Sequence, residues 1–136
     1  MSGLYDVRCK DVARFVATGT RTLQQIGDHI SKLYPSIDSK GSWVREPLTS
    51  WNPYIQNIDK DKYTLSDLGR ALISLPGREG EEPSEAEKAF LIGTMILFEP
   101  QRKVVAELIY VGKSNADEWM VTQTKSCLQK LGVAIP

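Results

Sequence analysis

Side chains that could bind nucleic acid gather at three places in the sequence. Base recognition needs forked donors or amides, whereas phosphate binding needs Lys, Arg, hydroxyls or a helix N-terminus. The first place is Thr20-Arg21-Thr22 at the expected start of a helix, the second is the stretch 40–52, and the third is the outer side of the last helix. With two lysines from a charged turn, the candidate contacts with double-stranded DNA are Arg21, Thr22, Lys40, Ser42, Trp43, Arg45, Glu46, Thr49, Ser50, Asn52, Lys60, Lys62, Gln123 and Lys125.

These groups also have ordinary structural explanations. Lysines and arginines on a helix face are usually only solvated, and tryptophans such as Trp43 and Trp51 often pack in a core. The turn Asp59-Lys60-Asp61-Lys62 carries charges of both signs that cancel. We therefore expect the main contacts upstream of this turn.

Residues for catalysis or metal binding are sparse. His29 is the only histidine, and it lies beside an apolar stripe, where a structural role is expected. A zinc site needs more Cys and His ligands at tighter spacing. Asp38-x-Lys40 resembles one fragment of a metal-dependent nuclease site, with Asp28 as the nearest acidic partner on its N-terminal side. We expect no catalytic residue, no metal and no cofactor, and an enzyme is the weakest of the functional readings.

The composition is that of an ordinary globular protein. The chain has 136 residues, of which 41% are hydrophobic, and its formal net charge is zero. A net charge of zero argues against a general nucleic-acid coat protein, which would be strongly basic. No apolar run approaches the length of a membrane span, and the N-terminus lacks a signal-peptide segment, so a cytoplasmic protein is expected. Cys9 and Cys127 are expected to be free thiols.

Residues 54–72 predict a strand, a short charged turn, a second strand and then a helix that starts at once. Ser66 can cap this helix, and Gly69 lies in its first turn. A β-ribbon that runs directly into a helix often ends a winged-helix module. The stretch therefore favours a binding module over an enzyme.

The remaining chain predicts mainly helices. Thr22-x-x-Gln25 and Ser84-x-x-Glu87 have the form of capping boxes. Between two prolines, only a short helix near 47–52 is expected. Helices are predicted over 6–17, from 22 to about 34, over 66–74, over 85–98, from 100 to about 112, and from 114 to about 132, where Met120, Cys127, Leu128 and Leu131 would face inward.

These elements predict a mainly α protein, namely a winged helix with a small β-ribbon and additional C-terminal helices. The turn-rich acidic stretch 76–84 is the best candidate boundary. We expect a winged-helix domain over 1–75 and a C-terminal helical subdomain over 76–136 that packs on it.

A group of short motifs resembles a known family. In order they are TGTR (18–21), SKGSWV (39–44), LTSW (48–51), YTLSDLG (63–69), EAEKAFLIGTMILFEPQRKVVAEL (85–108) and CLQKLGVA (127–134). This order is similar to the DNA-recognition part of the FokI-type IIS restriction endonucleases. The resemblance implies a winged-helix domain that reads a short asymmetric site, with Arg21 nearest to a base-contacting arginine and 40–46 matching a contact loop by segment only.

The chain also departs from that family. Pro53 shortens a helix that the family continues, Trp119 and Thr122 stand at positions where the family is basic, and the cleavage domain has no counterpart. The resemblance therefore implies either a recognition domain separated from a larger enzyme or a stand-alone relative, with a nuclease domain or subunit as a partner. The alternative is a winged-helix module for protein interaction or dimerisation, in which the apolar 85–98 helix packs a partner. The sequence leaves the oligomeric state open.

Overall fold

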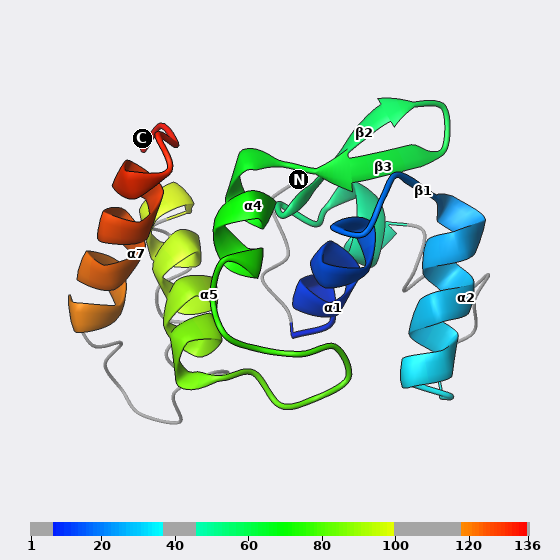
Figure 1. Cartoon of the computed structure of the whole chain (residues 1–136), viewed down its shortest axis with the longest axis horizontal. Helices are drawn as coiled ribbons and strands as arrows, with labels where there is room; N and C mark the ends of the chain where they lie inside the picture. Colours follow the sequence, from blue (N-terminus) through cyan, green and yellow to red (C-terminus); the bar gives the residue numbers. More distant parts are fainter. Residues whose placement is uncertain (1–6, 37–45, 100–117, 136) are drawn as a thin grey trace. The chain divides into compact units, whose positions relative to one another are not determined.

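The computed structural model describes residues 7–36, 46–99 and 118–135 (Figure 1). These residues form helices and one small antiparallel sheet, which confirms a mainly α protein with a minor β component. The chain divides into a first compact unit, Met1–Glu82, and a second, Pro83–Pro136. The boundary predicted after residue 75 thus lies seven residues before the division between the units.

Three helices of the first unit begin and end close to their predicted limits. Helix α1 spans Val7–Val16, α2 spans Leu23–Leu33 and α4 spans Asp67–Ile73. The capping box of α2 is present, because the side chains of Thr22 and Gln25 each accept a hydrogen bond from the other's backbone nitrogen. Ser66 caps α4 by accepting a hydrogen bond from the nitrogen of Gly69.

The sheet of the first unit has three strands, one more than the predicted ribbon. Strands β2 (Ile55–Asp59) and β3 (Lys62–Leu65) form the expected hairpin. Strand β1 (Arg21–Thr22), expected to lie at the start of a helix, pairs with β3 so that the strand order is β1-β3-β2. In Figure 1 the hairpin lies across one end of α1, with which both of its strands are in contact.

The short helix predicted over 47–52 is a π-helix, η1, that spans Glu46–Ser50. Asn52 ends it, because its Nδ2 donates hydrogen bonds of 3.2 Å to the carbonyl oxygens of Leu48 and Cys9. Its Oδ1 accepts one of 3.0 Å from the nitrogen of Tyr54. This amide thereby fixes the passage from η1 into β2 against α1.

The apolar core of the first unit is built from every element of that unit except β1. The predicted stripe of α2 is present, with Ile26 and Ile30 fully buried. The core side chains from α1, α2, η1, the hairpin and α4 include Cys9, Val12, Ala13, Val16, Ile26, Ile30, Leu48, Tyr54, Ile55, Tyr63, Ala71 and Leu72.

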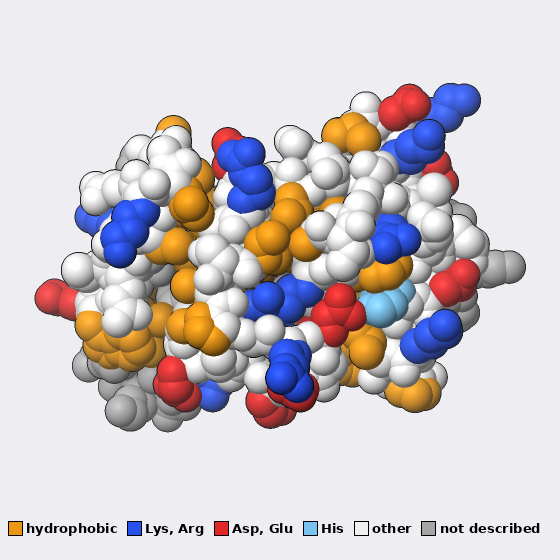
Figure 2. All heavy atoms as spheres, in the orientation of Figure 1, with side chains coloured by type: hydrophobic (Ala, Val, Ile, Leu, Met, Phe, Trp, Pro, Cys, Tyr) orange, Lys and Arg blue, Asp and Glu red, His pale blue; other side chains and the backbone are white. Residues whose placement is uncertain are grey.

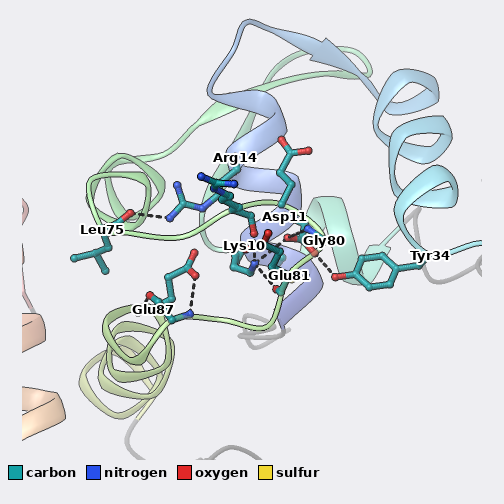
Figure 3. Close-up of polar contacts among 12 residues, drawn as sticks. Lys10, Asp11, Arg14, Tyr34, Leu75, Gly80, Glu81 and Glu87 are labelled. Atoms are coloured by element: carbon teal, nitrogen blue, oxygen red, sulfur yellow. Dashed lines mark hydrogen bonds and ion pairs between the residues drawn. The ribbon is translucent and has the colours of Figure 1, made fainter.

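A buried ion pair on α1 holds the segment that follows α4 (Figure 3). Nζ of Lys10 lies 3.1 Å from Oδ1 of Asp11 and donates hydrogen bonds to the carbonyl oxygens of Arg78 and Glu81. Asp11 accepts hydrogen bonds from the backbone nitrogen of Gly80 and the hydroxyl of Tyr34. Through these contacts the turn-rich stretch 76–82 is part of the first unit.

In the second unit, α5 (Glu85–Phe98) and α7 (Glu118–Lys130) lie side by side (Figure 1). The capping box of Ser84 and Glu87 starts α5 as predicted, and most of α5 is buried. The helix predicted from residue 100, and the predicted start of the last helix at residue 114, lie outside the described residues.

The inward stripe predicted for the last helix is only partly correct. Met120 and Leu128 are buried, but Leu131 is 47% exposed because it follows the end of α7. Thr124 is buried instead, with its Oγ1 donating to the carbonyl oxygen of Met120 and lying 3.3 Å from that of Ala89 on α5. Gly132, with φ of +71°, follows α7 as predicted.

Candidate nucleic-acid interface

The sheet brings two of the predicted contact segments together. Arg21 stands opposite Tyr63, and Thr22 stands opposite Lys62, in the pairing of β1 with β3. The backbone nitrogen of Leu23, which starts α2, donates a 2.8 Å hydrogen bond to the carbonyl oxygen of Asp61 at the hairpin turn. The N-terminus of α2 and the tip of the hairpin are therefore neighbours although they are far apart in sequence.

The tip of the hairpin is held by Asn57. Its Nδ2 donates hydrogen bonds of 2.7 Å to the carbonyl oxygen of Lys60 and 3.1 Å to that of Lys62. The strand register is irregular between Asn57 and Asp59, and Lys60 has a φ of +42°. The tip is thus a defined turn that exposes the side chains of both lysines.

Charges of both signs surround this tip. Asp59 and Asp61 are exposed beside Lys60 and Lys62, and Figure 2 shows basic and acidic side chains together over the end of the hairpin. Ile58 on β2 is 52% exposed and adds an apolar side chain next to these charges. The tip offers point charges rather than a continuous basic surface.

A hollow of about 450 Å³ lies between η1 and the hairpin. Its lining is mostly polar, and two of the predicted contacts, Ser50 and Lys60, border it with exposed side chains. The residues that line it are Thr49, Ser50, Ile55, Gln56, Asn57, Lys60 and Tyr63. Ser50 brings a hydroxyl and Lys60 an ammonium group to this lining, and both are donors that DNA phosphates accept. The amide of Asn57 is used within the hairpin, and the amide of Gln56 donates one hydrogen bond to the carbonyl oxygen of Leu65.

Two of the predicted contacts have buried side chains. Asn52 is 3% exposed, and both ends of its amide are used inside the first unit, as described above. Thr49 is 2% exposed and is one of the residues that line the hollow. Neither side chain therefore contributes much to the exposed surface of the first unit.

Arg21 is half-buried and held by its neighbours. Its Nη2 donates a 2.7 Å hydrogen bond to Oγ1 of Thr18, and its guanidinium carbon lies 4.6 Å from the centre of the Phe15 ring. Its Nε is buried and has no hydrogen-bond partner among the described residues. The arginine predicted as a contact is therefore oriented by α1 and the turn that follows it.

The other predicted contacts divide into two groups. Lys40, Ser42, Trp43 and Arg45 lie outside the described residues, and of Glu46 only its place at the start of η1 is described. Gln123 and Lys125 are exposed on α7 of the second unit, on the same helix as Trp119, which is 42% exposed.

Several residues that shape this surface were not predicted. Asn57 shapes the turn, Tyr63 joins the hollow to β1, and Phe15 supports Arg21. His29, expected to be structural, stacks on Phe15 and hydrogen-bonds to Glu79. Of these residues, only Asn57 could have been found from the local sequence, because it is a polar strand residue beside a charged turn. The roles of Tyr63, Phe15 and His29 depend on contacts between segments that are distant in the sequence.

Within the described ranges, no cluster of three or more His, Cys, Asp or Glu side chains is arranged to hold a metal ion. In the same ranges, no helix combines the length and the apolar character needed to cross a bilayer. Comparison with models of protein families, with curated proteins and with solved structures found no match for this chain.

Proposed function

We propose that the first unit is a winged-helix module that binds double-stranded DNA, with the β2–β3 hairpin as its wing. The observation that carries the proposal is the pairing of β1 with β3. The element order helix, strand, helix, short helix and hairpin, with the first strand added to the hairpin, is the order of a winged helix.

In this proposal the contact surface runs from the N-terminus of α2 across the hairpin tip to the hollow beside η1. Arg21, Lys60 and Lys62 would supply positive charge to phosphates, and Ser50 and Gln56 would supply neutral donors. The nearby aspartates limit the non-specific attraction, since they oppose the phosphate charge. Such a surface fits a protein whose DNA binding depends on the shape of the surface and the positions of its donors rather than on a large positive potential.

The resemblance to the recognition domains of FokI-type restriction endonucleases extends the proposal. It suggests sequence-specific binding, with no catalytic site in this chain and with cleavage supplied by another domain or subunit. The shared order of motifs is the support for this extension.

Binding to a labelled duplex, followed by fluorescence anisotropy at low and at moderate salt, tests the proposal. We expect binding at micromolar protein or tighter at low salt, weakening as salt rises because phosphate contacts release counterions. K60A/K62A should weaken binding, and D59N/D61N should strengthen it. K32A is the matched control, since Lys32 is exposed at the far end of α2 from β1. No binding by the unaltered protein at micromolar concentration and low salt would show the proposal to be wrong.

The second candidate is a winged-helix module for protein interaction or dimerisation. The exposed Ile58 on the hairpin favours it. The apolar helix α5 does not, because Phe90, Leu91 and Ile92 are already buried within the chain. Size-exclusion chromatography with light scattering separates the two candidates. A stable dimer that has no affinity for DNA, and that the I58S substitution dissociates into monomers, would favour the interaction module.

A further inference from the structure

Three side chains from different elements form one stack in the first unit. The rings of Phe15 on α1 and His29 on α2 are parallel within 5°, with centroids 3.9 Å apart. The guanidinium carbon of Arg21 on β1 lies 4.6 Å from the Phe15 centroid. Because His29 covers one face of the Phe15 ring, the guanidinium must lie over the other face.

Both ends of this stack are fixed by polar contacts. Thr18 accepts the hydrogen bond from Nη2 of Arg21, and Glu79 lies 2.5 Å from Nε2 of His29. Glu79 belongs to the stretch that Lys10 and Asp11 anchor on α1. An arginine supported on one face and at one nitrogen has lost much of its rotamer freedom before any ligand arrives, which lowers the entropic cost of binding.

The fixed orientation also limits what Arg21 can recognise. Its Nε is enclosed and its Nη2 is engaged by Thr18, so the side of the guanidinium that joins these two nitrogens is not available for a paired contact. The outer edge, formed by Nη1 and the remaining hydrogen of Nη2, stays available to donate to an oxygen of DNA.

We infer that Phe15 is a positioning residue that holds Arg21 for contact with a phosphate of duplex DNA, and that the His29–Glu79 pair holds Phe15 in turn. This inference rests on the proposed DNA-binding function. It assigns to Arg21 a phosphate contact because phosphate and sugar oxygens accept the larger share of protein–DNA hydrogen bonds. It also connects the segment after α4 to the contact surface through His29 and Phe15.

A double-mutant cycle on the full chain tests the inference, with Kd measured by anisotropy on two duplexes of unrelated sequence. R21A should weaken binding to both duplexes equally and reduce the slope of log K against log salt by about 1. F15L should weaken binding about threefold to tenfold in the unaltered background, as expected for a lost cation–π support. In the R21A background, F15L should change Kd by less than about twofold, since the supported group is gone.

Two further variants separate positioning from a general loss of folding. F15Y keeps the aromatic face and should restore nearly normal affinity. E79A should weaken binding only while Arg21 is present. Circular dichroism on each variant identifies any that does not fold, and F15Y and E79A then decide the question without F15L.

The outcomes are distinguishable. If the unaltered protein binds neither duplex, the proposed function and this inference are both wrong. If it binds but R21A leaves Kd unchanged, the phosphate contact of Arg21 is wrong while a hairpin-based interface stands. If R21A weakens binding and F15L has the same effect in both backgrounds, the positioning role of Phe15 is wrong.

Discussion

Gly69 on α4 lies directly against the backbone of Tyr54, so that a Cβ on Gly69 would stand 1.9 Å from the Tyr54 carbonyl oxygen. The same carbonyl accepts a 3.2 Å hydrogen bond from the nitrogen of Ser66, and Oγ of Ser66 donates to the carbonyl oxygen of Pro53. The start of α4 is therefore tied to the chain just before the hairpin. This contact fixes the base of the proposed wing.

G69A should strongly destabilise the first unit, because either α4 or the Tyr54 backbone must move to admit the methyl group. We expect a loss of about 3 kcal/mol in the free energy of unfolding, the upper end of the usual effect of overpacking. Urea denaturation followed by circular dichroism measures it. R70A in the same helix is the control, since its ion pair with Asp67 is exposed and contributes little. Equal stability of the two variants would contradict the close approach.

K10M should also be destabilising, although methionine fits the space of a buried lysine stem. It leaves Asp11 as a buried charge and removes the donor to the carbonyl oxygens of Arg78 and Glu81. Breaking one side of a buried pair typically costs about 3–5 kcal/mol. The double variant K10M/D11N should be more stable than K10M, because the amide removes the unpaired charge and its oxygen can still accept from Gly80.

Urea denaturation of both variants checks this, with K88A as control because the Lys88–Glu85 pair is largely exposed. Hydrogen exchange at the amide of Gly80 adds a local readout. Faster exchange at Gly80 in K10M, with α5 amides unchanged, would locate the effect in the 76–82 segment. An unchanged exchange rate at Gly80 would argue against a role of Lys10 and Asp11 in holding the 76–82 segment.

Local signals in the sequence predicted the starts of α2, α4 and α5 correctly. In each capping box, the side chains of the cap residue and of the Gln or Glu three residues later each accept a hydrogen bond from the other's backbone nitrogen. Four neighbouring residues are therefore enough to predict where the helix starts. Ser66 before α4 follows the same rule with its hydroxyl alone. Such contacts do not depend on the rest of the fold.

Contacts between distant segments were not predictable in this way. Strand β1 is two residues long and exists only because β3, some forty residues later, pairs with it. Lys10 and Asp11 interrupt an otherwise apolar face of α1, and their burial depends on carbonyl and amide groups of residues 78–81. Asparagine can read a base edge, but the side-chain amide of Asn52 donates a hydrogen bond to the carbonyl oxygen of Cys9 on α1 instead.

Lys60 allows stability and binding to be separated. Its φ of +42° is in the left-handed region, where a side chain costs roughly 1–2 kcal/mol relative to the right-handed one. K60G should therefore raise the free energy of unfolding, by about 0.5–1 kcal/mol after the entropic penalty of glycine. K60A removes the same charge but keeps the Cβ, so its stability should stay close to that of the unaltered protein.

Both variants should weaken DNA binding to the same extent, because both lose one positive charge at the hairpin tip. Thermal unfolding and anisotropy on the same preparations provide the comparison. A K60G protein that is more stable and binds as well as before would exclude Lys60 from the interface. Different affinities of K60A and K60G would instead indicate that the rigidity of the turn matters.

Helices α5 and α7 are in close contact at Gly93 and Thr124. A Cβ on Gly93 would lie 2.0 Å from Oγ1 of Thr124, 2.7 Å from its Cβ and 2.9 Å from the carbonyl oxygen of Met120. G93A should destabilise the second unit by about 2–3 kcal/mol, since the two helices must separate. T124A removes the nearest atom, so G93A/T124A should be less destabilised than the sum of the two single variants. Urea denaturation of the four proteins in this cycle measures the coupling, and simple additivity would mean that the helices do not pack through this pair.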